Sequence, residues 1–569
     1  MKFDEILQYL GEFGFYQKRI YFLICFLATT TMFQPVAQVF LTPATDHWCS
    51  TPQLERQECT EWADGTIDTE TCNELKYNAT IPENDEETIL PENNCRRCDI
   101  TYSEFNMDTK RCELSDPNIQ KCDDGWEYDH SQYKSTVIQD FNLVCDDGTK
   151  ASLAQSIYFF GVLIGSFLFG ALADIIGRKK TMFLCLFIAF VFGIAVAFSP
   201  GYWWFTMFRF IVGFANIGTY LAAFTIATEL VGPSKRTFVG MVINFYTSAG
   251  LIIYGLLAYL IRDWRYLQLA ITLPNMFFFF IIPIVPESVR WLMSQKKFDE
   301  AEDLIKECAR VNKAESLPEK LFEEEMMVDP SKGTTYTVAD LFKTPNLRKK
   351  TINILYNWMV NSLVYYGLSL STASLGGRDY LAFILSGVVE IPAFIVAIPA
   401  IDKFGRRPVL CLFMVMGGIA CFATVWIPLG WGRTFVALIG KFGIAGSFGI
   451  IYVFSAELYP TPVRSVGMGI SSMTARVGGI IAPIILELGK IWPPLPQTIF
   501  SIMSVSAGFL ALLLPETLNK NLPETIEDGE NFGKKKPIHK MKNKSDVEKE
   551  NFSCQTEMES SFTNKALQL

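Results

Sequence analysis

Long apolar runs recur along this chain of 569 residues, separated by shorter polar segments. A helix that crosses the hydrocarbon core of a bilayer needs about 20 mostly apolar residues. Twelve runs have about this length, and they predict membrane-spanning helices at Ile20–Leu41, Ala151–Ala173, Thr181–Ser199, Tyr202–Thr228, Phe238–Leu260, Tyr266–Val285, Thr351–Ser371, Tyr380–Ile401, Val409–Leu429, Thr434–Ala456, Val466–Leu488 and Pro493–Leu514. An apolar share of 50% and an aromatic share of 14% favour this all-α membrane fold class over a soluble one.

The polar segments divide the chain into parts. These are an N-terminus (1–19), the first span (20–41), a long loop (42–150), spans two to six (151–285), a linker (286–350), spans seven to twelve (351–514) and a tail (515–569). Helical periodicity at Phe298–Arg310 predicts amphipathic linker helices that bridge two halves. The tail is rich in Lys, Glu, Ser and Asn, which predicts that it is largely disordered.

Short basic loops indicate the orientation. Clustered Lys and Arg occur at Gly177–Lys180, Lys235–Arg236 and Arg406–Arg407, and twelve spans place all three on the same side as both termini. The positive-inside rule makes that side cytosolic, so the loop at 42–150 faces outside. No signal peptide precedes the first span, which we expect to act as its own uncleaved signal.

The long loop holds eight cysteines, an even number that favours disulfides in an oxidising compartment. They are Cys49, Cys59, Cys72, Cys95, Cys98, Cys112, Cys122 and Cys145, and their pairing cannot be deduced from the sequence. Asn78-Ala79-Thr80 is an N-glycosylation acceptor sequence in the same loop. Zinc is the alternative for Cys95-x-x-Cys98, but we find no second pair or His that completes a site, so we expect no metal.

Two halves of the chain repeat with an offset of 228 residues. Asp174, Gly177 and Arg178 recur as Asp402, Gly405 and Arg406, and Glu229 with Arg236 recurs as Glu457 with Arg464. The pattern predicts two parallel six-helix halves. Asp, Glu and Arg at these spacings suit ion pairs that hold one state and break in another, as alternating access requires. Solvated loop charges are the alternative, which explains the basic residues but not the repeated acids.

These loops resemble the signature of the major facilitator superfamily. The chain also resembles solute carrier family 22. The resemblance is carried by the Cys-rich loop together with Phe3-Asp4-Glu5-Ile6-Leu7, Ala227-Thr228-Glu229-Leu230, Pro286–Leu292 and Ala456–Thr461. The resemblance runs from residue 1 to about residue 525. It implies a plasma-membrane carrier of small organic cations, anions or carnitine-like zwitterions.

Four charged residues lie well inside predicted spans, away from the span ends, where such groups face a bundle interior or an aqueous cavity because insertion costs about 2.5–3.5 kcal/mol each. We expect Arg476 to bind a substrate carboxylate through parallel hydrogen bonds, and Glu390 to face a substrate ammonium. A fixed Arg476–Glu390 ion pair is the structural alternative. Arg209 and Lys441 are expected to be packing or hydrogen-bonding residues.

The resemblance adds to this interpretation. In family 22 the position of Arg476 is acidic in cation carriers and Arg in anion and carnitine-type carriers, whereas Glu390 follows the cation and carnitine-type pattern. Both together imply a zwitterion. Aromatic faces hold ammonium groups, and the candidate rings are Tyr220, Phe245, Tyr246, Trp358, Tyr365 and Tyr366, of which Tyr220, Tyr246, Trp358 and Tyr365 are our candidates for substrate contacts.

The sequence contains no Gly-x4-Gly-Lys-Ser/Thr loop for nucleotide phosphate, so we expect a secondary transporter and not an enzyme. The predicted partners are a small organic cation or zwitterion and the lipid bilayer, with no nucleic acid. No cofactor is expected, although sodium or protons are candidate coupling ions. An electrogenic organic cation uniporter is the first alternative and an organic anion carrier the second. A receptor built on the Cys-rich loop is a remote alternative, because it gains nothing from two duplicated gating loops.

Overall fold

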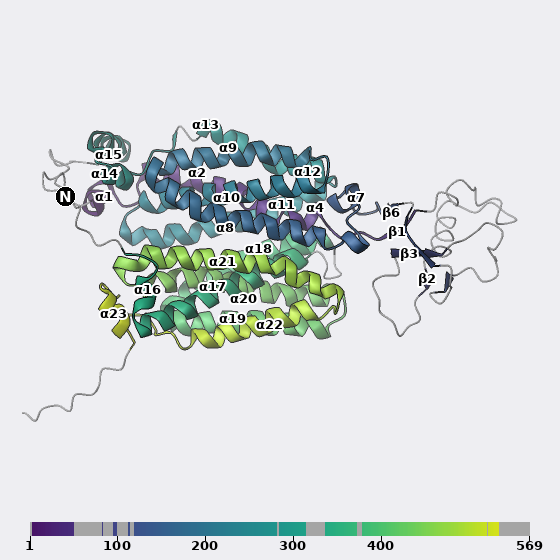
Figure 1. Cartoon of the computed structure of the whole chain (residues 1–569). Helices are drawn as coiled ribbons and strands as arrows, with labels where there is room; N and C mark the ends of the chain where they lie inside the picture. The colour runs from purple at the N-terminus through teal and green to yellow at the C-terminus, as the bar shows by residue number, and fades with distance from the viewer. Residues whose placement is uncertain are drawn as a thin grey trace, which may run out of the picture.

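The computed structural model describes residues 3–50, 82–83, 95–98, 112–113, 119–123, 125–281, 284–314, 336–372, 378–520 and 522–533. Long helices lie side by side in two bundles, and short strands project from one end (Figure 1). We call the end with the strands the loop end. The opposite end, where both terminal regions lie, is the terminal end.

The first bundle, the N-half, contains the helices α2 (Phe15–Thr31), α3 (Phe33–Val36), α4 (Gln38–Leu41), α8 (Lys150–Ile176), α9 (Arg178–Ala197), α10 (Tyr202–Glu229), α11 (Arg236–Leu260), α12 (Trp264–Thr272) and α13 (Asn275–Ile281). The second bundle, the C-half, contains α17 (Pro345–Ser371), α18 (Asp379–Phe404), α19 (Arg406–Trp426), α20 (Trp431–Leu458), α21 (Arg464–Glu487) and α22 (Leu495–Ala511). Every predicted span therefore falls on one or more helices.

Nine stretches of helix in the described part of the chain are long and apolar enough to cross a membrane. The other three predicted spans differ for local reasons. The sixth is split between α12 and α13 around Pro274, since proline lacks the N–H that an unbroken helix needs. The seventh, α17, is long but carries many Asn, Ser and Lys residues, and the twelfth, α22, has 17 residues.

The two halves contact each other along the pairs α8 with α21 and α11 with α18. Near the loop end, Ser152 donates to Glu487 Oε2 (2.6 Å) and Tyr133 donates to Asp379 Oδ2 (2.9 Å). The ring of Phe40 stacks on that of Tyr380 with centroids 5.1 Å apart. Hydrogen bonds and packed rings thus close the interface of the halves at the loop end.

The repeat is visible in the backbone of the two basic turns. Gly177 and Gly405 both have positive φ, 103° and 96°, which favours glycine over other residues. A Cβ on Gly405 would lie 2.7 Å from Glu516 Oε2, and a Cβ on Gly177 would clash with the equivalent Glu287. The sequence repeat therefore marks two turns that require glycine for the same two reasons.

The long loop forms short strands. β1 (His47–Cys49) pairs antiparallel with β6 (Trp126–Tyr128), β3 (Arg96–Cys98) pairs antiparallel with β5 (Ile119–Lys121), and β2 (Pro82–Glu83) pairs parallel with β4 (Cys112–Glu113). The loop returns to the bundle through α7 (Val137–Asp140), where Arg265 forms an ion pair with Asp140 (3.1 Å).

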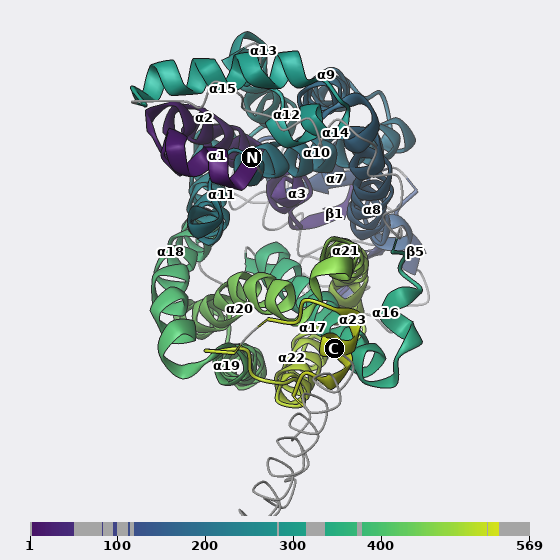
Figure 2. The ribbon, with the colours of Figure 1, turned by 90° about the vertical axis from the view of Figure 1, so that its left-hand side faces the viewer.

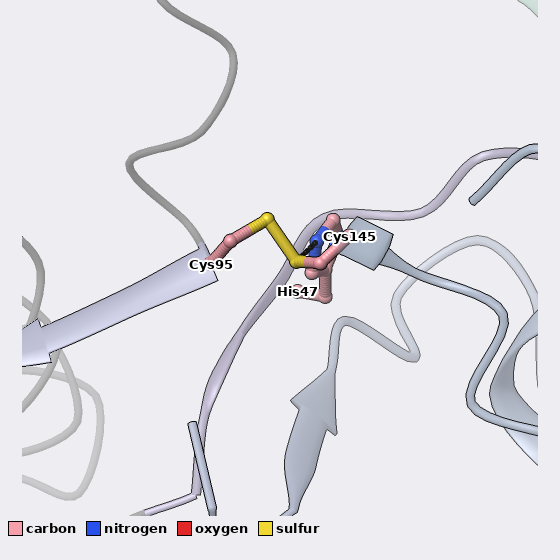
Figure 3. A group of neighbouring side chains, drawn as sticks. All are labelled: His47, Cys95 and Cys145. Carbon is pink, nitrogen blue, oxygen red and sulfur yellow. Dashed lines mark hydrogen bonds between the residues drawn. A yellow bond between two sulfur atoms is a disulfide. The ribbon is translucent and has the colours of Figure 1, made fainter. Parts of the chain in front are cut away.

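Disulfides join Cys49 to Cys122 and Cys95 to Cys145, which confirms the predicted disulfide chemistry for these four residues. Cys59, Cys72 and the glycosylation candidate Asn78 lie outside the described residues, and the side chains of Cys98 and Cys112 are not described. His47 lies beside the second disulfide, with Nε2 3.9 Å from Cys145 Sγ (Figure 3). These three residues are close enough for a metal site, but sulfurs joined to each other are not thiolate ligands.

Shorter helices cover the terminal end (Figure 2). They are α1 (Phe3–Leu10), α14 (Val289–Ser294), α15 (Phe298–Asn312), α16 (Asp340–Lys343) and α23 (Ile526–Asn531). The amphipathic linker helix is confirmed as α15, whose buried residue Ile305 shares an apolar cluster with Leu7 of α1. It lies against α1 and α2, so the described contacts place it beside the N-half and do not support the expected bridge between the two halves. The expectation of a largely disordered tail is wrong for α23, because a Thr525 capping box starts this helix and Glu530 accepts from the N–H groups of Asn346 and Leu347 at the start of α17. Residues 534–569 lie outside the described residues.

Candidate functional site

A cavity of about 130 Å³ lies between the two halves. Its wall contains residues from both, namely Thr31, Met32, Pro35, Tyr158, Phe159, Val162, Asn216, Ile217, Tyr220, Asn244 and Thr247 from the N-half and Tyr365, Tyr366, Glu390, Phe394, Phe448, Tyr452 and Arg476 from the C-half. Both of the charged side chains proposed for substrate binding reach this wall. A ligand in the cavity would therefore contact both bundles.

Arg476 lies midway along α21 and is 8% exposed. Its guanidinium interacts electrostatically with the hydroxyls of Tyr220, Tyr366 and Tyr452. Among the described residues, its Nε has no hydrogen-bond partner and no carboxylate forms an ion pair with it. A buried cation without a counter-ion is costly, so an anionic group that entered the cavity would be strongly stabilised here.

Glu390 has a different partner from the one considered in the sequence. Its Oε1 lies 3.1 Å from Lys441 Nζ, and both side chains are only 2% exposed. Its Oε2 accepts a hydrogen bond from Ser248 of α11 in the N-half (2.8 Å). The alternative of a fixed Arg476–Glu390 pair is therefore wrong, since Lys441 is the cation that balances Glu390.

Lys441 is held from several sides behind the cavity wall. Its ammonium lies 3.3 Å from the centroid of the Tyr365 ring and donates to Ser369 Oγ. Contact with a carboxylate, a ring face and a hydroxyl stabilises a buried ammonium. Because Glu390 and Lys441 cancel, the charged groups at the cavity sum to the single positive charge of Arg476.

A cluster of aromatic rings forms much of the C-half wall. Tyr365 lies 5.4 Å from Tyr366 and 5.6 Å from Phe448 between ring centroids, and Phe448 lies 5.8 Å from Tyr452. Phe159 of the N-half contacts Tyr366 at 4.5 Å. Ring faces attract ammonium groups, so this cluster offers a surface for a cation next to the positive guanidinium.

Three of the six candidate rings, Phe245, Tyr246 and Trp358, do not line the cavity. Trp358 is fully buried in the C-half and donates from Nε1 to Ser455 Oγ (2.9 Å), which is a packing role. Tyr246 packs against the core of the N-half, with its ring 6.5 Å from Phe22. Phe448 and Tyr452 line the wall instead; they are four residues apart on α20, the spacing that places side chains on one helix face.

Arg209 is completely buried in the N-half. It donates to Gln34 Oε1 (3.1 Å), the Gln34 carbonyl (3.2 Å) and Gln155 Oε1 (3.2 Å). Its guanidinium also lies 4.4 Å from the centroid of the Tyr158 ring, which lines the cavity. Arg209 therefore fixes α10 against neighbouring helices, and Gln34 is occupied by this contact.

The repeated acids and arginines meet in pairs at the terminal end. Arg178 contacts Asp174 (2.9 Å) and Glu229 (3.4 Å), and Arg406 contacts Asp402 (3.5 Å) and Glu457 (3.1 Å). Glu287 and Glu516 accept from the backbone N–H groups of the two turns. Each network joins three helices within one half. Arg464 instead donates to the Tyr459 carbonyl and Thr461 Oγ1.

Two repeated helix bundles around a charged central cavity define a secondary transporter with the major facilitator fold. Among solved structures, the inward open conformation of the xylose transporter XylE from E. coli matches with a TM-score of 0.54 over 69% of this chain and 92% of that chain. The sequence identity is 18%, so this likeness shows the fold alone.

Proteins of similar sequence indicate the family within this class of transporters. The family described as "Sugar (and other) transporter" matches residues 116–528. The organic cation transporter protein of Drosophila melanogaster is 42% identical and covers 94% of this chain and 96% of its own length. The beta-alanine transporter of D. melanogaster is 35% identical, with 93% and 89% covered, and human solute carrier family 22 member 2 is 35% identical, with 96% and 99% covered.

The chain belongs to the sugar (and other) transporter family of the major facilitator superfamily, and within it to solute carrier family 22. It is thus a multi-pass membrane transporter and not an enzyme.

Proposed function

We propose that this protein carries small zwitterionic organic solutes, of the carnitine or β-alanine kind, across the plasma membrane by alternating access. Arg476 binds the carboxylate of the solute. The rings of Tyr365, Tyr366 and Phe448 bind its ammonium group beside Glu390. Both termini lie in the cytosol.

The observation that carries this proposal is the lone positive charge of Arg476 in the cavity wall. Glu390 is balanced by Lys441, so a solute with only a positive charge would enter a site that is already cationic. A carboxylate offers Arg476 two parallel hydrogen bonds and removes the unpaired charge. The adjacent rings then accommodate the amine of the same molecule.

The names of the relatives bear on both charges of the proposed solute. One of them is named a beta-alanine transporter, and β-alanine carries an amine and a carboxylate. Others are named organic cation transporters, which favours the alternative that this protein carries cations of many kinds. The two proposals differ in what Arg476 does, since a cation carrier has no need of a guanidinium in its site.

Alternating access is supported by the asymmetry of contacts along the interface. The halves are joined by Ser152–Glu487 and Tyr133–Asp379 at the loop end, so the described arrangement is closed towards the side that we assign to the outside. Transport then requires these contacts to open. The ion pairs of Arg178 and Arg406 are already formed in this arrangement, each within one half, so they are candidate latches of the described state.

The test is uptake into proteoliposomes of L-carnitine, β-alanine and tetraethylammonium, by wild type and Arg476→Gln. Hydrogen bonds to charged groups contribute about 1.5–3 kcal/mol each, so the variant should lose about tenfold or more in kcat/KM for the zwitterions while tetraethylammonium uptake is maintained. Arg310→Gln, an exposed arginine on α15, is the matched control and should behave as wild type.

Equal loss for zwitterions and tetraethylammonium would contradict the role of Arg476. Preference of the wild type for tetraethylammonium, unchanged in the variant, would favour the cation carrier. Absence of saturable flux for all three solutes would contradict the proposed substrate class. The same vesicles, with imposed sodium, proton or potassium-diffusion gradients, identify the driving force.

A further inference from the structure

A second, larger cavity of about 830 Å³ opens at the terminal end of the C-half, away from the central site. It lies between the start of α17 and the end of α22, and Phe532 and Gly533, which directly follow α23, also line it. The proposed transport mechanism assigns nothing to this groove.

Cationic side chains gather at its mouth. Lys349, Lys350 and Arg407 line the groove, and no Asp or Glu is among the lining residues of this described region. Lys350 donates to the carbonyls of Gly529 and Phe532, so its ammonium holds α23 in place. The side chains of Lys349 and Arg407 form no ion pair with the described residues, which leaves two positive charges available to an anion.

Aliphatic side chains also line the groove, beside the polar Asn346, Asn353 and Tyr356. Ile352 of α17 is 54% exposed, Leu510 of α22 is 37% exposed and Leu513 just beyond it is 75% exposed. All three line the groove. Basic and aliphatic side chains therefore line the same groove.

This combination of basic and aliphatic side chains complements an amphiphile with an anionic head. A free phosphate ion would use the two cations and leave the leucines exposed. A membrane lipid would place its phosphate between Lys349 and Arg407, where a guanidinium suits bidentate contact, and its acyl chains along α17 and α22.

We propose that the groove between α17 and α22 binds an anionic glycerophospholipid from the leaflet at the terminal end. The site is separate from the central cavity, so it does not depend on the identity of the transported solute. Its occupant bridges α17, α22 and the first turn of α19.

The test uses the full-length protein in detergent and a phosphatidylserine analogue with a photoactivatable acyl chain. We expect labelled peptides from α17 and α22, with phosphatidylcholine as a weak competitor and phosphatidylserine as a strong one. A basic residue near a membrane surface contributes about a fivefold gain in affinity for anionic lipid. Lys349→Gln combined with Arg407→Gln should therefore weaken labelling about 25-fold.

Arg348→Gln combined with Lys403→Gln is the matched control, because both residues are exposed cations of the same end that do not line the groove. This variant should label as wild type. Leu513→Trp tests the apolar part without a change in charge and should also reduce labelling. Gel filtration shows whether each variant is folded, and added salt should weaken labelling of the wild type in any case.

Equal competition by phosphatidylcholine and phosphatidylserine would overturn the proposal. So would wild-type labelling of the Lys349→Gln/Arg407→Gln protein, or labelling that inorganic phosphate abolishes as well as lipid does. Failure of the zwitterion proposal leaves these outcomes unchanged, because none of the variants touches the central cavity.

Discussion

Lys441 Nζ lies 3.1 Å from Glu390 Oε1, in a position where neither side chain is more than 2% exposed. The pair links α20 to α18 directly behind the central cavity. Because both side chains are buried, the charge of each one is tolerated only with the opposite charge beside it.

The first prediction concerns this dependence. Lys441→Met should leave Glu390 as an unpaired buried carboxylate, and removing one partner of a buried pair costs about 3–5 kcal/mol. The thermal midpoint of the purified protein should fall clearly. Glu390→Gln with Lys441→Met removes both charges and should recover most of the loss, as a double-mutant cycle of thermal midpoints would measure. A double variant no more stable than Lys441→Met would show that the pair is not coupled.

The second prediction concerns the two glycine turns. Gly405→Ala should lower transport and expression because it combines a positive φ with a contact of 2.7 Å to Glu516. A backbone strain of this kind costs about 1–3 kcal/mol. Gly177→Ala should have a similar effect. Gly170→Ala is the control, since no atom lies within 4 Å of its Cβ position, and it should leave uptake unchanged.

The third prediction concerns the closed loop end. Tyr133→Phe removes the hydrogen bond to Asp379 but keeps the ring, which packs 5.7 Å from Tyr380. The loss should favour states open at the loop end, by about 1.5–3 kcal/mol if Asp379 is ionised. Thiol labelling of a cysteine introduced at Asn216, in the cavity wall, should become faster from the loop side. Tyr128→Phe, whose hydroxyl contacts Asn142 within the loop, should not change the labelling rate.

The fourth prediction concerns the cysteines of the loop. Proteolysis without reduction should yield peptides joined through Cys49–Cys122 and Cys95–Cys145, identified by mass spectrometry. Zinc should not bind at His47, Cys95 and Cys145 in the oxidised protein. Recovery of a Cys95–Cys98 disulfide, or stoichiometric zinc, would contradict the described pairing.

The helical spans and their repeat could be predicted from the sequence for physical reasons. Membrane helices need long apolar runs, and the turns at Gly177 and Gly405 need glycine, so both leave a strong local pattern. The α23 segment was missed because its stability comes from a capping box and from contacts of Glu530 with α17, which short polar sequences do not reveal.

Only some residues of the candidate site could be predicted from the sequence. Arg476, Glu390, Tyr220 and Tyr365 reach the cavity, since charges and polar rings inside spans tend to face the interior. The partner of Glu390 was not accessible, because it depends on how α18 and α20 are rotated. The same rotation decides that Trp358 faces Ser455 while Tyr452 faces the cavity. Helix rotation about its own axis is set by packing, and a span that is apolar on nearly all sides does not encode it clearly.

Ser248 and Glu390 belong to different halves, whereas Lys441 moves with Glu390. In an alternating-access cycle, rotation of the halves would therefore separate the hydroxyl from Glu390 Oε2 and leave the ammonium in place. One oxygen of the carboxylate would keep a permanent counter-ion while the other gained and lost its donor with each turnover. The acceptor strength presented to the cavity would then vary with the direction in which the transporter faces.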